Sequence, residues 1–158
     1  MVDRLGDLQR CVEEVRALHN KLILVLGPPG CGKTALVAEF AGRNGIERIS
    51  VGADLGSRMA EVPRRQRPIG AGEAMRQLLD ASGTEKLAVL DDIELLFDQL
   101  LKLDPLALLK HAARSRCVVA VWPGELRDGR LRYAELGHPE FRDYSLDGIV
   151  PFAMDVIQ

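Results

Sequence analysis

The chain has 158 residues, of which 47% are hydrophobic and 28% charged, and its formal net charge is −2. These values are typical of a globular protein and predict one domain over residues 1–158. A net charge this small excludes bulk attraction to nucleic acid or membranes, so any such contact needs a local basic patch. No run of about 18 apolar residues predicts a membrane span, and the three cysteines have no metal or disulfide spacing. We therefore expect a cytoplasmic protein without a membrane partner.

The N-terminal segment, Asp3 to His19, is expected to form an amphipathic helix. Its apolar residues recur at helical spacing: Leu5, Leu8, Val12, Val15 and Leu18. Such a helix either covers a sheet or walls an adenine pocket.

A P-loop pattern follows the first apolar strand. The strand spans Lys21 to Leu26, the motif Gly27-x-x-x-x-Gly32-Lys33-Thr34 comes next, and Ala35 to Ala41 is expected to be a helix. Glycines let backbone N–H groups converge on phosphate oxygens, and the helix adds about half a positive charge there. Lys33 would contact the β- and γ-phosphates of ATP, and Thr34 would bind Mg²⁺. The expected nucleotide-binding residues are Gly27, Pro28, Pro29, Gly30, Cys31, Gly32, Lys33, Thr34 and Ala35.

A short strand over Ile46 to Val51 and a short helix over Ser57 to Val62 are expected after the P-loop helix. Pro63 ends that helix, and the densest basic cluster of the chain lies between Pro63 and Pro68: Arg64, Arg65 and Arg67. The prolines predict a loop or an extended segment. Three interpretations stay open: a solvated loop, an arginine finger acting on a neighbouring subunit's γ-phosphate, or a contact with the phosphates of DNA or RNA.

A pair of carboxylates ends the third expected strand, Lys86 to Asp91, which follows a helix over Glu73 to Ala81. Asp91 is placed as a Walker-B aspartate is, to hold Mg²⁺ through water. Asp92 takes the position where many P-loop ATPases carry a glutamate that polarises the attacking water. Because aspartate is one methylene shorter, either Asp92 or Glu94 is the candidate for that role.

The C-terminal half predicts more buried elements. Ile93 to Leu103 is expected to be a buried helix or turn, and Leu106 to Ala113 a helix capped by Asp104, with Pro105 at its first position. Cys117 to Trp122 is expected to be a buried strand. In the ATPases that this chain resembles, the corresponding strand ends in a polar residue that senses γ-phosphate. Here the strand ends in Trp122, and this departure argues against γ-phosphate sensing by the strand.

A β-hairpin is predicted over Leu126 to Leu131, because Asp128-Gly129 is a two-residue turn signal. The hairpin carries Arg127, Arg130 and Arg132, which would keep it soluble, contact nucleic-acid phosphates or form a subunit interface. Val150 to Val156 is expected to be the last strand.

Apolar strands that alternate with helices predict an α/β fold, a three-layer P-loop NTPase sandwich with a mostly parallel sheet and a C-terminal β-hairpin. Ligand would bind at the carboxyl ends of the strands. The P-loop motif, Gly27 to Thr34, resembles that of AAA+ ATPases, whose last strand is usually followed by a helical lid. This chain resembles such a core without the lid.

Longer stretches resemble the BrxF family, small P-loop proteins of bacterial BREX anti-phage systems. The stretches are Pro63 to Pro68, Leu90 to Phe97, Leu103 to Lys110, Val121 to Gly124 and Gly137 to Glu140. The resemblance implies a role in defence beside a methyltransferase and other BREX components. It implies no established catalytic mechanism.

Three functions are compatible with these patterns. The first is an ATPase that hydrolyses ATP slowly and switches or assembles a defence complex, as a homo-oligomer with arginines reaching across subunits. The second is a small-molecule P-loop kinase, although no acceptor site is evident. The third is a nucleotide-binding scaffold that hydrolyses little. ATP with Mg²⁺ is expected over GTP because no Asn-Lys-x-Asp motif occurs. DNA is a candidate partner through the Arg64–Arg67 cluster or the Arg127–Arg132 hairpin.

Overall fold

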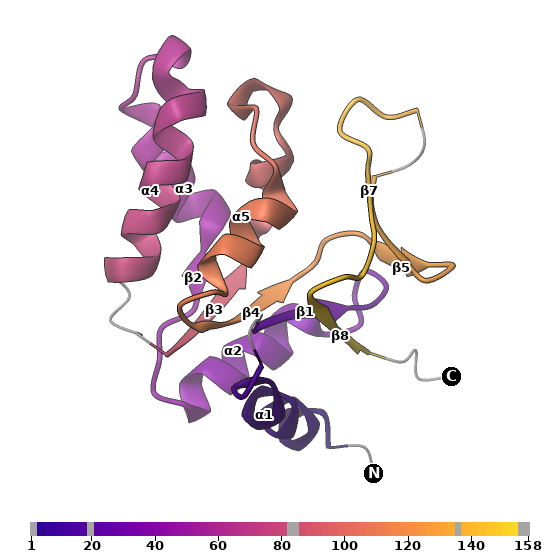
Figure 1. Ribbon diagram of the computed structural model, residues 1–158. Helices are drawn as coiled ribbons and strands as arrows, with labels where there is room; N and C mark the ends of the chain where they lie inside the picture. Colours follow the sequence, from indigo (N-terminus) through magenta and orange to yellow (C-terminus); the bar gives the residue numbers. More distant parts are fainter. Residues whose placement is uncertain (1–2, 19–20, 82–85, 135–136, 155–158) are drawn as a thin grey trace.

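A computed structural model describes residues 3–18, 21–81, 86–134 and 137–154 (Figure 1). Its main sheet has five strands in the order β2-β3-β4-β1-β8, and every neighbouring pair is parallel. The bounds are β1 Leu22–Leu26, β2 Ile49–Ser50, β3 Leu87–Asp91, β4 Cys117–Val121 and β8 Ile149–Ala153. The predicted α/β fold with a mostly parallel sheet is confirmed.

Helices cover both faces of this sheet, so its central strands are apolar on both sides (Figure 1). One face packs on α1 (Arg4–Val15) and α2 (Lys33–Arg43), and the other on α3 (Val51–Ala60), α4 (Arg67–Ala81) and α5 (Pro105–Ala112). Successive strand residues alternate between the two cores. In β1, for example, Ile23 faces α1 and α2, whereas Leu24 faces the other three helices.

A second, antiparallel sheet contains β5 (Glu125–Arg127), β6 (Arg130–Tyr133) and β7 (Arg142–Tyr144). The predicted hairpin is confirmed: Asp128 and Gly129 form its turn with positive φ values of 53° and 73°. The third strand of this sheet, β7, was not predicted, and β8 follows it in the main sheet, where a last strand was expected.

Buried aromatic residues tie the second sheet to the main core. The Trp122 indole is fully buried, and its Nε1 donates a hydrogen bond to the carbonyl oxygen of Arg132 at 2.9 Å. Phe97 packs edge-on against both Trp122 and Tyr133. The hairpin therefore stands at a fixed place beside the end of β4.

The predictions around β2 are wrong in two respects. The strand is Ile49–Ser50 and not 46–51, and the next helix begins at Val51 and not at Ser57. Helix α3 buries Val51, Leu55 and Met59, which recur every four residues along one face. This burial outweighs the strand propensity of Val51.

The predicted loop around Arg64 is also corrected. Arg64–Gln66 forms a 3-10 helix, and Arg67 begins α4, six residues earlier than the expected Glu73. Pro68 lies in the first turn of α4, where proline removes no helical hydrogen bond. The predicted element over Ile93–Leu103 consists of two 3-10 helices, Ile93–Phe97 and Gln99–Leu101.

Two predicted helices are confirmed with adjusted ends. Asp104 caps α5 by accepting a hydrogen bond from the Ala107 N–H at 3.1 Å. Helix α1 ends at Val15, and Leu18 beyond it is half exposed and does not continue the buried stripe. His19, Asp155 and Val156, which the predictions included, lie outside the described residues. In the described part of the chain, no helix is long and apolar enough to span a membrane.

Candidate nucleotide-binding site

The P-loop connects β1 to α2 through a tight turn with two left-handed glycines. Gly30 has φ 80° and Gly32 φ 95°, values that residues with a Cβ rarely adopt. Gly27 is needed for another reason: a Cβ there would lie 2.6 Å from the Cys31 sulfur and 3.3 Å from Met154. These three glycines fix the course of the loop.

The functional side chains of the motif lie where helix α2 begins. Lys33 is its first residue, and its Nζ donates a hydrogen bond to the Gly27 carbonyl oxygen at 2.6 Å. Thr34 is exposed in the first turn. The first backbone N–H groups of a helix have no partner within the helix, so this end favours an anion. Lys33, Thr34 and the loop N–H groups therefore suit a phosphate chain.

A cavity of about 700 Å³ opens beside the loop. Pro28 and Pro29 form one wall, the segment after β4 forms another, and Met154 follows β8 on the third side. Figure 1 shows the loop after β1 lying next to β5, in agreement with this lining. Ligand cavities commonly have volumes of roughly 300–1,000 Å³, and this cavity lies within that range, although Lys33, Thr34 and Asp91 are not among the residues that line it.

Asp91 ends β3 at the same carboxyl edge of the sheet as the P-loop. It is the one buried charged residue among those the structure describes, with 7% exposure. Both of its oxygens accept hydrogen bonds: Oδ2 from the Arg48 guanidinium at 2.8 Å, and Oδ1 from the Asp92 N–H at 2.8 Å. Asp91 is thus held in a fixed orientation by both hydrogen bonds.

Asp92 is held by the start of α3. Its backbone is left-handed, with φ 55° and ψ 50°, and its carbonyl oxygen accepts from the Gly52 N–H at 2.8 Å. The Ser50 hydroxyl donates to Asp92 Oδ2 at 3.2 Å. A Cβ on Gly52 would lie 2.4 Å from that same oxygen, so only glycine leaves room for the carboxylate.

Glu94 joins these two carboxylates. Partial burial, a hydrogen bond with Asp92 and the charges of Asp92 and Asp91 raise the pKa of Glu94 to about 7. The negative charges of Asp92 and Asp91 thus disfavour ionisation of Glu94, and a bound cation would relieve this effect. Glu94 can therefore accept a proton from a water molecule near neutral pH.

The oxygens available for a metal ion come from two elements, Thr34 on α2 and Asp91 on β3. Hydroxyl and carboxylate oxygens are ligands that Mg²⁺ prefers, and the ion usually keeps several waters. No group of three or more His, Cys, Asp or Glu side chains in the described ranges is arranged to bind a metal on its own. The donor set fits Mg²⁺ held jointly with nucleotide phosphates.

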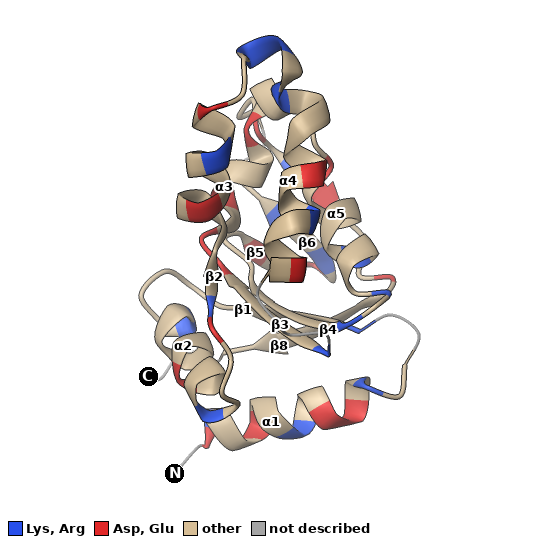
Figure 2. Cartoon of the chain, turned by 90° about the vertical axis from the view of Figure 1, so that its left-hand side faces the viewer, with Lys and Arg blue, Asp and Glu red and all other residues tan. Residues whose placement is uncertain are grey.

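The arginines of the Arg64–Arg67 cluster lie at the tip of the α3–α4 hairpin, away from the sheet (Figure 2). The Arg67 Nε donates to the Val62 carbonyl oxygen at 2.9 Å and so closes the turn. Arg64 and Arg65 are exposed, and their side chains have no hydrogen bond or ion pair with any other described residue. The fold does not bring these three arginines to the P-loop of their own chain.

The arginines of the second sheet differ from this tip because acids compensate them. Arg130 pairs with Asp143 at 2.9 Å, Arg132 lies 3.8 Å from the same carboxylate, and Arg127 lies 3.7 Å from Glu125. This pairing lowers the net positive charge that the hairpin presents to a phosphate backbone.

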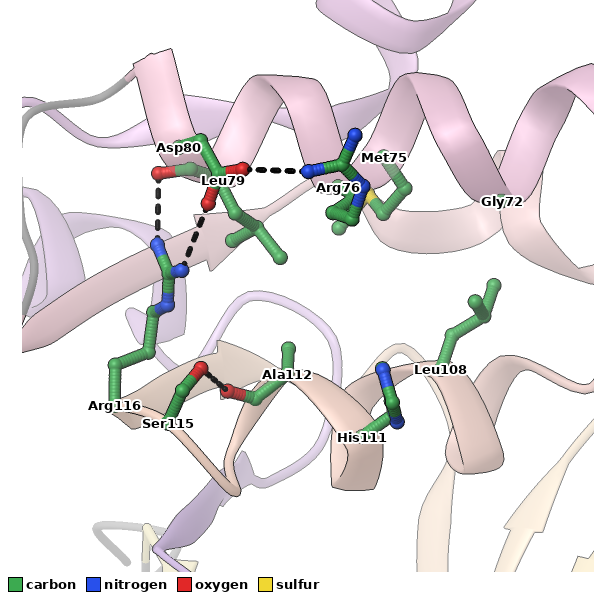
Figure 3. Close-up of a pocket in the computed structure, with 10 residues that line it drawn as sticks. All are labelled: Gly72, Met75, Arg76, Leu79, Asp80, Leu108, His111, Ala112, Ser115 and Arg116. Atoms are coloured by element: carbon green, nitrogen blue, oxygen red, sulfur yellow. Dashed lines mark hydrogen bonds and ion pairs between the residues drawn. The ribbon is translucent and has the colours of Figure 1, made fainter.

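A second hollow, of about 230 Å³, lies between α4 and α5 (Figure 3). Asp80, on α4, pairs with Arg76 on the same helix and with Arg116, which follows α5, each at 3.0 Å. Asp80 and Arg116 precede β3 and β4 in the chain, so this groove lies at the amino ends of the strands. The groove therefore lies at the opposite end of the strands from the P-loop, and its arginines are already paired with acids.

Sequence reasoning missed Arg48, Ser50 and Gly52, the residues that contact the carboxylates. Arg48 and Ser50 are two positions apart, a spacing that places them on the same side of an extended segment. That spacing was visible in the sequence, but nothing local indicates which strand pairs with β2. The parallel pairing of Ser50 with Asp91 supplies this information.

Comparisons with known proteins find similarity over part of this chain. No family model matches the chain. Over 91 residues, or 56% of this chain, it is 32% identical to the replication factor C large subunit of Methanococcus aeolicus, and it spans 18% of that relative's length. The match to the solved structure of C. elegans PCH-2 covers 74% of this chain and 36% of the PCH-2 chain, with a TM-score of 0.45 and 14% sequence identity. The similarity to replication factor C supports an AAA+-like relationship, whereas neither comparison supports the BrxF resemblance.

Proposed function

We propose that this chain binds ATP with Mg²⁺ at the P-loop and hydrolyses it slowly, as a cytoplasmic, AAA+-like ATPase. The observation that carries the proposal is the placement of the P-loop and the Asp91–Asp92 pair at one edge of a parallel sheet. The similarity to the replication factor C large subunit supports the same class. A second support is the cavity beside Pro28 and Pro29.

In this proposal each residue has a separate task. The loop N–H groups and Lys33 bind the phosphates, and Thr34 and Asp91 hold the metal ion. Bound Mg²⁺ supplies neutralisation of the phosphate charge. Asp92, held by Ser50 and Gly52, or Glu94 beside it, orients a water molecule and accepts its proton.

Slow hydrolysis follows from two features of the site. Asp92 is shorter than the glutamate that activates water in many ATPases, and its carboxylate already accepts a hydrogen bond from Ser50. Trp122 directly follows β4, and its indole is buried and donates a hydrogen bond to the Arg132 carbonyl oxygen, so it offers no group to γ-phosphate. The site is thus better suited to binding ATP than to hydrolysing it.

The slow ATPase would serve as a switch or an assembly factor in a BREX defence complex, as the BrxF resemblance implies. The exposed tip of the α3–α4 hairpin suits a contact between subunits of a homo-oligomer, with Arg64 or Arg65 reaching a neighbour's phosphate. The same tip is the better candidate for a DNA contact, since the hairpin arginines are compensated.

The experiment has three measurements on the wild-type chain: binding of a fluorescent ATP analogue, phosphate release without an acceptor, and oligomeric mass with and without ATP–Mg²⁺. Binding together with slow phosphate release supports the proposal. Binding without release would favour a nucleotide-binding scaffold, and release only with a small-molecule acceptor would favour a kinase. Absence of binding would overturn all three.

A further inference from the structure

The β2 segment presents two polar side chains to the two carboxylates. Arg48 directly precedes β2 and Ser50 ends it, while Ile49 between them turns into the core at 5% exposure. Arg48 contacts Asp91, and Ser50 contacts Asp92. One short edge strand therefore holds both acidic residues in place.

The Arg48–Asp91 contact is a close ion pair at the carboxylate that is the candidate for metal binding. Arg48 Nη1 lies 2.8 Å from Asp91 Oδ2, and the side chains are 35% and 10% exposed. The other oxygen of Asp91 accepts the Asp92 N–H. A cation that approaches Asp91 must share it with a guanidinium already in hydrogen-bonding contact.

We propose that Arg48 is a positioning residue that competes with Mg²⁺ for Asp91, so that binding of the metal with nucleotide displaces or weakens the Arg48–Asp91 pair. This inference rests on the proposed nucleotide site. A positive guanidinium beside the carboxylate repels a divalent ion, and the repulsion is strong because Asp91 is shielded from water. Arg48 thus raises the Mg²⁺ concentration that the site needs.

A second role of the pair is compatible with this proposal. A buried carboxylate without a partner is costly, so Arg48 also holds Asp91 in place when no metal is bound. A merely structural pair would leave the Mg²⁺ requirement unchanged. The Mg²⁺ requirement therefore shows whether Arg48 competes with the metal ion or only supports Asp91.

The test measures binding of a fluorescent ATP analogue as Mg²⁺ is titrated, in the wild type, in Arg48→Gln and in Arg43→Gln. Arg43 is an exposed arginine in the last turn of α2, so its variant removes the same charge away from the carboxylates. We expect the half-saturating Mg²⁺ concentration to fall about tenfold in Arg48→Gln and to stay unchanged in Arg43→Gln. Binding without Mg²⁺ should be equal in all three.

An unchanged or higher Mg²⁺ requirement in Arg48→Gln would overturn the inference, as would weaker binding of the analogue without Mg²⁺, which would make Arg48 a phosphate contact. Should Arg48→Gln fail to fold, Arg48→Lys replaces it. The lysine keeps the charge but loses the guanidinium geometry, and we expect a smaller decrease in the Mg²⁺ requirement. No decrease there would also overturn it. If the wild type binds no analogue at any Mg²⁺ concentration, the proposed function fails and the inference with it.

Discussion

The Lys33 ammonium group donates a hydrogen bond to the carbonyl oxygen of Gly27, at 2.6 Å, so the lysine lies over the loop that precedes it. The contact keeps the charge at the P-loop, next to the first turn of α2. Replacing Lys33 removes both the charge and this hydrogen bond. The loop course itself depends on the glycines and not on the lysine.

We therefore expect Lys33→Ala to fold with nearly wild-type stability and to bind ATP at least about tenfold more weakly, a loss of about 1.4 kcal/mol. Titration with a fluorescent ATP analogue measures the affinity, and a thermal melt checks the fold. Wild-type affinity in this variant would contradict the phosphate role of Lys33.

Gly52 gives a test of Asp92 that leaves the P-loop untouched. A Cβ at Gly52 would lie 2.4 Å from Asp92 Oδ2, so Gly52→Ala should move that carboxylate while ATP binding persists. A misplacement of about 1 Å can cost roughly 10²-fold in rate, and we expect a loss of that order in phosphate release. Gly56→Ala in the same helix is the control, because its Cβ would meet only Leu95 at 3.7 Å. Equal turnover in both variants would remove Asp92 from the mechanism.

The cysteines should report nucleotide binding by their rates of alkylation. Burial raises the pKa of Cys117 to about 11, and its side chain is fully buried, so the thiol stays protonated and inaccessible. Cys31 is partly exposed in the P-loop. We expect iodoacetamide at pH 8.5 to modify Cys31 first, ATP–Mg²⁺ to slow this reaction, and Cys117 to react only after unfolding, as measured by mass spectrometry.

The sign of the pH dependence follows from the same pKa. The neutral thiol of Cys117 is favoured in the folded state, so its contribution to stability is complete below pH 9.0 and is lost as the pH rises toward about 11.

ATP that fails to protect Cys31 in the wild type, or that protects it equally in Lys33→Ala, would contradict nucleotide binding at the loop.

The junction between the two sheets should be sensitive to the size of residue 124. A Cβ on Gly124 would lie 1.7 Å from the Arg132 carbonyl oxygen and 2.8 Å from the Trp122 Nε1. We expect Gly124→Ala to lower the free energy of unfolding by about 1–3 kcal/mol, measured by urea denaturation. Gly42→Ala in α2 meets nothing within 4 Å and should instead be neutral or stabilising by up to about 1 kcal/mol. Equal stabilities would contradict this packing.

The three arginines of the Arg64–Arg67 cluster should separate into two kinds. Arg67→Ala removes the hydrogen bond to Val62 and should lower the free energy of unfolding by about 1 kcal/mol. Arg64→Ala and Arg65→Ala should change stability by less than about 0.5 kcal/mol. If either arginine acts in trans, its loss should lower phosphate release by about 10³-fold or more without affecting ATP binding. Unchanged turnover and oligomeric mass in all three would exclude a finger here.

Much of the fold could be predicted from sequence because its signals are local. The P-loop and its glycines, the buried strands at Leu22 and Cys117, the Asp104 cap and the Asp128-Gly129 turn each depend on residues within one element. Local chemistry alone restricts such segments to a few conformations.

The start of α3 could not be predicted in this way. Val51 begins a helix because Val51, Leu55 and Met59 pack against residues distant in the chain, and the same residue reads locally as a strand former. The helical start at Arg67 has a similar origin, because Ala71, Ala74 and Met75 are buried in the same core.

The sequence by itself determined that the chain carries a P-loop motif and an acidic pair, since each is contiguous in the sequence. Only the tertiary structure decided which residues surround the pair. Arg48 is 43 positions from Asp91, and Ser50 is 42 positions from Asp92. Their contacts exist because β2 pairs with β3, and strand pairing is decided by the energy of the whole sheet and its two cores rather than by any local pattern.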